Sequence, residues 1–108
     1  MPQNDFLPFA SLPGANVVTP AEWAADAERM LGFVRGVAKS NKANTAWRQA
    51  SFIACAIAQY MVDTLGVDML DDGNLANFVN HFNGAINTNV TNTIKSIGRE
   101  MLTSPRIY

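Results

Sequence analysis

The chain contains one cysteine and one histidine among its 108 residues, which excludes an intramolecular disulfide and argues against a Cys/His metal site. Eight basic residues nearly balance nine acidic ones, whereas a nucleic-acid-binding protein usually carries a basic surplus. The longest apolar run is residues 52–58, far below the roughly 20 residues of a membrane span. The first five residues hold no Lys or Arg, so no secretory signal is expected. These absences predict a soluble protein, or part of a soluble assembly, without nucleic-acid partners.

Hydrophobic residues make up 48% of the sequence, which argues against intrinsic disorder and, at this length, favours a single domain. The patterns described below predict a mainly α fold of three to four helices. We expect an extended docking arm over residues 1–18 and a helical domain over 19–86. Residues 87–108 are expected to form a C-terminal helix or trimerisation segment with a loose end.

The expected arm combines prolines with large apolar side chains. Pro2, Pro8 and Pro13 each remove a backbone donor and disfavour helix at the preceding residue. Its candidate docking anchors are Phe6, Leu7, Phe9 and Leu12. Such a segment cannot bury these side chains alone, so they either lie on the domain's own helices or dock on a partner.

A first helix is predicted over residues 20–38. Thr19 and Glu22 form a capping box around Pro20, which suits the first helical position. Apolar residues then recur at helical spacing as far as Val37. A loop is expected at residues 40–44.

A second helix is predicted over residues 45–65, ended by Gly66. Residues 52–62 are apolar nearly all round, which is typical of a helix buried on several sides and indicates association with other copies. Trp47 and Arg48 near its start are typical both of a helix end packed on a loop and of an interface anchor.

After a loop at residues 67–74, a third helix is predicted over residues 74–86, with its apolar residues on one stripe. A continuing helical seam would place five apolar residues three or four apart, although residues 87–93 are poor in helix formers. The candidate seam residues are Ile86, Val90, Ile94, Ile97 and Met101. The end is expected to be loose from Thr103.

No residue pattern indicates catalysis. Cys55 lies in the most apolar stretch, where a thiol is usually inert, and His81 has no second metal ligand at a diagnostic spacing. Asp68, Asp71 and Asp72 suit a turn and helix cap better than a calcium loop, which needs alternating oxygen ligands and a distal Glu. We therefore expect no enzyme activity, no metal and no cofactor.

Five stretches together resemble the N-terminal attachment region of bacteriophage tail fibre proteins. Their order along the chain, with an apolar arm followed by Trp-Arg-Gln and Asp-Asp-Gly elements, carries the resemblance. The stretches are residues 4–10, 13–17, 32–38, 44–54 and 71–78.

The resemblance implies a virion structural protein of the phage tail, assembled in the host cytoplasm. It implies a homotrimer that meets tail or baseplate proteins, and other fibre components, through its N-terminal arm. Because the sequence ends at residue 108, it implies a short fibre or adaptor rather than a host-recognition tip. The alternative is a small helical assembly chaperone or regulator without a virion role.

Overall fold

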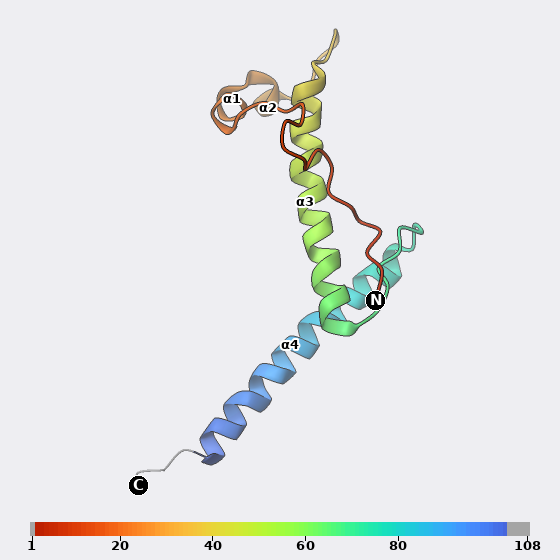
Figure 1. Cartoon of the computed structure of the whole chain (residues 1–108), viewed down its shortest axis with the longest axis vertical. Coiled ribbons are helices and arrows are strands. Elements are labelled where there is room, and N and C mark those ends of the chain that lie inside the picture. The colour runs from red at the N-terminus through yellow and green to blue at the C-terminus, as the bar shows by residue number, and fades with distance from the viewer. Residues whose placement is uncertain (1, 104–108) are drawn as a thin grey trace. The chain divides into compact units, whose positions relative to one another are not determined.

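The chain is mainly α-helical, as the sequence predicts. The computed structural model describes the backbone of residues 2–103 and the side chains of residues 2–99. Its helices are α1 (Pro20–Ala25), α2 (Ala27–Leu31), α3 (Ser40–Leu65) and α4 (Leu75–Thr103) (Figure 1). Among the described residues there is no strand, only an isolated parallel bridge between Asn4 and Met69.

The chain divides into two compact units. Unit 1 comprises the residues up to Asp5 together with those from Ile57 onward, and unit 2 comprises Phe6–Ala56. The helix α3 contributes its first part to unit 2 and its last part to unit 1.

The predicted helix over residues 20–38 is wrong beyond its first turns. Its start is confirmed, because the hydroxyl of Thr19 accepts the backbone N–H of Glu22 at 3.2 Å. Asp26 interrupts the helix with extended backbone, and its carboxylate caps α2 instead. Gly32, at φ 88°, then ends α2 in the left-handed region, where glycine is favoured. Residues 32–39 are not helical.

The predicted loop at residues 40–44 is also wrong, because α3 begins at Ser40. The polar side chains that suggested a loop bind the N-terminal segment, as described below. The other end of this helix is confirmed, because Gly66 lies at φ 67° and its N–H donates to Val62 at 2.9 Å.

The predicted third helix and its continuation form one helix, α4. Asn74 caps it, since its side-chain oxygen accepts the N–H of Asn77 at 3.0 Å. The Asn- and Thr-rich stretch remains helical, and the hydroxyl of Thr93 donates to the carbonyl of Asn89, one turn back. The expected loose end from Thr103 lies, apart from Thr103 itself, outside the described residues.

Unit 1 has the larger core. Its fully or nearly buried apolar side chains are Ala58, Met61, Val62, Met69 and Ala85. The last turns of α3 pack on α4, where a Cβ added at Gly84 would lie 3.6 Å from Leu65. In the same contact the hydroxyl of Tyr60 donates to the carbonyl of Ala85 and accepts from the amide of Asn89.

Unit 2 has only two buried residues, Val18 and Thr45. With so little apolar burial, its order depends on hydrogen bonds and an ion pair between the N-terminal segment, α2 and α3.

Candidate interaction surfaces

In unit 2, the first turns of α3 hold the N-terminal segment by side-chain hydrogen bonds. The hydroxyl of Thr45 accepts the backbone N–H of Val18 at 3.0 Å and donates to the carbonyl of Asn41 at 2.7 Å. From the adjacent position, the amide of Asn44 donates to the carbonyl of Asn16 at 2.9 Å. These polar side chains satisfy backbone groups that would otherwise be left without partners, which explains their place on a helix.

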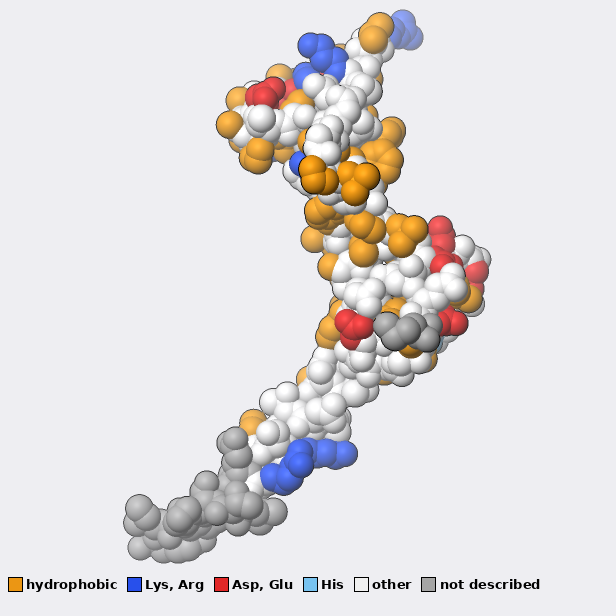
Figure 2. Space-filling model, viewed as in Figure 1, with side chains coloured by type: hydrophobic (Ala, Val, Ile, Leu, Met, Phe, Trp, Pro, Cys, Tyr) orange, Lys and Arg blue, Asp and Glu red, His pale blue; other side chains and the backbone are white. Residues whose placement is uncertain are grey.

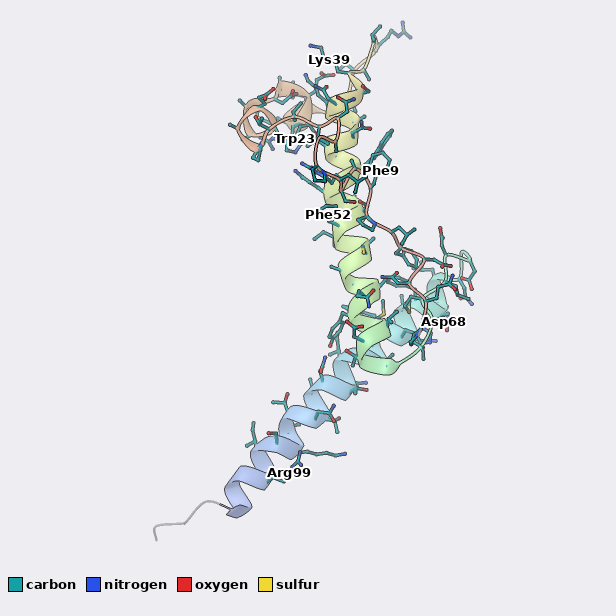
Figure 3. The ribbon with its side chains drawn as sticks, in the orientation of Figure 1. Phe9, Trp23, Lys39, Phe52, Asp68 and Arg99 are labelled. Carbon is teal, nitrogen blue, oxygen red and sulfur yellow. The ribbon has the colours of Figure 1, made fainter. Side chains whose placement is uncertain are left out.

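Further along α3, Phe9 lies on Trp47, with ring centroids 5.8 Å apart in an edge-to-face arrangement. The N–H of Phe9 donates to the hydroxyl of Ser51 at 2.8 Å. The structure thus brings together one predicted docking anchor and one predicted interface residue of the same chain, and Figure 3 shows Phe9 beside α3. This matches the first alternative for Phe9, in which the side chain lies on its own helix.

The other predicted anchors differ in exposure. Leu7 and Leu12 are 72% and 77% exposed, while Phe6 is half-buried. Trp47 remains 59% exposed despite its contact with Phe9, and Arg48 is half-buried.

Apolar side chains are also exposed elsewhere in unit 2. Phe52 and Ile53 on α3 are 45% and 64% exposed, so this part of the helix is not enclosed. In the segment after α2, Val34 and Val37 are exposed as well. Figure 2 shows the hydrophobic side chains gathered over the N-terminal segment and the neighbouring part of α3.

A three-way ion pair joins α2 to α3. The ammonium group of Lys42 lies 2.8 Å from carboxylate oxygens of both Asp26 and Glu28. The hydrogen bond from Lys42 lowers the pKa of Asp26, and its two acidic partners raise the pKa of Lys42. The Asp26 carboxylate therefore both caps α2 and pairs with α3.

We expect this ion pair to make unit 2 sensitive to acid. Because the pKa of Asp26 is lower in the folded state, its contribution is present above its ordinary pKa and is lost as the pH falls through the lowered value. Asp26→Asn keeps a capping side chain but removes the charge, so its urea midpoint should change less between pH 6 and pH 3 than that of the wild type. Asp26→Ala, which also loses the cap, should have a lower midpoint than Asp26→Asn at pH 6. Equal acid sensitivity of Asp26→Asn and wild type would show that this ion pair does not make unit 2 sensitive to acid.

In unit 1, residues 3–5 are hydrogen-bonded to the loop before α4. The N–H of Gln3 donates to the carboxylate of Asp68 at 2.7 Å. Met69 donates to the carbonyl of Gln3 at 2.8 Å and accepts from Asp5 at 2.9 Å. The carboxylate of Asp5 accepts from the side chain of Gln3 and from the N–H of Asp71, and these bonds lower its pKa. The Asp-rich loop thus binds the start of the chain, a contact that the sequence analysis missed.

Along α4 runs a row of exposed apolar side chains, which includes four of the five predicted seam residues. Ile94 and Ile97 are 63% and 52% exposed; Met101 lies outside the described side chains. The row begins earlier than the predicted seam, since Leu75 and Val79, which lie on the predicted apolar stripe of the third helix, are 73% and 45% exposed. Its other exposed members are Ile86 and Val90.

No chemical site emerges among the described residues. They hold no group of three or more His, Cys, Asp or Glu side chains placed to bind a metal ion. Cys55 is half-buried, and Nδ1 of His81 is buried without a hydrogen-bond partner. Over the same residues, no helix is long and apolar enough to cross a membrane.

Comparison of the chain with known protein families, with curated proteins and with solved structures found no match.

Proposed function

We propose that this protein is a non-enzymatic structural component of a phage tail, a short fibre or fibre adaptor that assembles as a homotrimer and anchors through its N-terminal arm. The observation that carries the proposal is the amount of apolar surface that each copy leaves exposed in both units. Contiguous exposed apolar surface of this kind marks interaction sites. The resemblance to the attachment region of tail fibres supplies the class of assembly.

In this proposal the two kinds of surface have different roles. The arm, through Phe6, Leu7, Phe9 and Leu12, docks on a tail or baseplate protein, and three arms on one trimer add avidity. Trp47 and Arg48 contribute to the adjoining interface. The seam of Ile94, Ile97 and Met101 joins the three copies about their axis. The proposed location is the virion tail, after assembly in the host cytoplasm.

The first test is the mass of the purified protein in solution. Sedimentation equilibrium should give three times the chain mass of 11.7 kDa at micromolar concentration. A single-chain mass would contradict the trimer and favour the alternative, a small helical assembly chaperone or regulator. Immunogold labelling should then place the protein on the tails of particles released from the host. Label absent from the particles would overturn the virion role.

Docking should depend on the two most exposed anchors. Leu7→Ser/Leu12→Ser removes two side chains whose burial contributes about 1.5–3 kcal/mol each, so its affinity for purified tails should fall by at least about a hundredfold. Substitution is a cleaner test than deletion of residues 2–18, because Phe9 and residues 3–5 carry hydrogen bonds within the chain.

The matched control is Leu31→Ser/Val34→Ser, which changes two side chains that are 83% and 71% exposed outside the arm. Co-sedimentation with tails measures both variants. If the arm variant binds tails as tightly as the control, the arm is not the docking element.

A further inference from the structure

The exposed row on α4 has a period of eleven residues. Leu75, Ile86 and Ile97 lie eleven residues apart, and so do Val79 and Val90. Eleven residues in three turns is 3.67 residues per turn, close to the 3.6 of an α-helix, so such a row runs almost straight along the helix. The row therefore stays on one face of α4 from its first residue to its last turns.

The members of this row remain exposed in unit 1. Residues nine positions apart on a helix lie about 180° apart. Gly84, which approaches Leu65 of α3, is nine residues after Leu75. Thr88, which is half-buried, is nine residues after Val79. The last turns of α3 thus pack on α4 opposite part of the row, and beside it at Asn89, which is three residues after Ile86 and donates to the hydroxyl of Tyr60.

The basic side chains near the C-terminal end of α4 also lie away from the row. Residues 73–94 contain no Asp, Glu, Lys or Arg. Lys95 and Arg99 follow Ile86 and Val90 by nine residues, so they lie opposite the row; Figure 3 labels Arg99 on the C-terminal part of α4. Identical rows can therefore meet in register without bringing these like charges together.

Thr93 lies beside the row, three residues after Val90, and its polar group is accommodated within the helix. It lies eleven residues after Phe82, which is half-buried. Its hydroxyl donates to the carbonyl of Asn89 at 2.9 Å. Its donor is thus satisfied without a partner from outside the helix, and burial of this position leaves no unmade hydrogen bond from the donor.

We infer that the occupant of this face is the same face of α4 in two further copies, arranged as a parallel, in-register three-helix bundle from Leu75 to the end of the helix. This inference rests on the proposed homotrimer. It extends the predicted seam, whose first residue is Ile86, by three turns to Leu75 at the N-terminal end of α4. Closed three-fold symmetry requires the helices to run in one direction and in register. Ile94 and Ile97 are three residues apart, as the a and d positions of a coiled coil are, and Ile at both positions favours three or more helices over two. The period of 3.67 residues gives a slight right-handed supercoil.

Single cysteines in a Cys55→Ala background test the arrangement. Ile97→Cys should form disulfide-linked pairs under mild oxidation, with a yield approaching about two thirds, because only two of three copies around one axis can share a bond. Lys95→Cys, on the opposite face, is the control and should stay near the background yield. Mixing Ile97→Cys with Leu75→Cys and mapping the linked peptides should give 97–97 and 75–75 links without 75–97 links.

The outcomes separate the inference from the proposed function. A trimer by sedimentation in which Ile97→Cys links no better than Lys95→Cys, or in which 75–97 links predominate, overturns the bundle and leaves the trimeric tail component standing. A monomer by sedimentation overturns both. Linking of Ile97→Cys at a mass of two chains overturns the three-fold arrangement.

Discussion

Val90→Asp should dissociate the assembly into single chains. Val90 lies in the middle of the exposed row on α4 and is 52% exposed in one copy. Burying a valine contributes about 1.5–3 kcal/mol, so three copies lose about 4.5–9 kcal/mol even before the cost of an unpaired carboxylate is counted. That loss lowers the association constant by at least about a thousandfold.

The charge-matched control is Asn92→Asp, two residues further along α4 and outside the row. It adds the same charge but should leave the sedimentation mass unchanged. Circular dichroism at 222 nm should also fall for Val90→Asp, because a helix end without a packed face is only marginally stable in water. If both variants keep the wild-type mass, the row is not the contact between copies.

Thr45→Val should destabilise unit 2 by about 1–3 kcal/mol, although it changes the shape of the side chain very little. Thr45 is 2% exposed, and its hydroxyl is the hydrogen-bond acceptor for the backbone N–H of Val18. Removing the acceptor leaves a buried donor without a partner, which costs more than the hydrogen bond itself contributes. Val18 is the one other buried residue among those described in unit 2, so this loss has little else to offset it.

Thr45→Ser is the control, because it keeps the hydroxyl and loses only a methyl group. Amide hydrogen exchange at Val18 and urea unfolding should separate the two variants, with faster exchange and the lower midpoint in Thr45→Val. Equal exchange at Val18 in both would show that this hydrogen bond does not hold the segment on α3.

Some parts of the fold could be predicted because local signals agreed with the tertiary structure. The cap at Thr19 and the end of α3 at Gly66 depend only on neighbouring residues. The break at Asp26 could not be predicted, because the side chain fits a helix until its carboxylate finds two backbone N–H groups and Lys42. Local hydrogen bonding of Asp competes with the helix in this way.

The start of α3 could not be predicted from local sequence either. Ser40 and Asn44 are residues that favour loops, yet here they bind the side chain and the carbonyl of Asn16 from helical positions. Those partners are 24 and 28 residues away in sequence, so no local pattern contains them.

The interaction surfaces were harder to predict than the helices. Helical periodicity marks an apolar stripe but does not say what covers it, so the stripe that holds Leu75 and Val79 could not be assigned to a core or to an interface from the sequence. Exposure in the structure assigns them to the same row as Ile94 and Ile97. Among the predicted contact residues, Phe9 and Trp47 are brought together within one chain.

The bonds between residues 3–5 and the loop at residues 68–71 also set an order of events during synthesis. Gln3 and Asp68 are 65 residues apart, and Asp5 and Asp71 are 66 apart, so residues 3–5 find these partners only after the intervening chain has been made. Unit 2 is encoded wholly within that interval. If unit 2 folds first, the flexible chain between residues 3–5 and residues 68–71 becomes shorter. Less conformational entropy is then lost when these two segments come together. The connectivity of this protein therefore favours folding of unit 2 before the two segments of unit 1 come together.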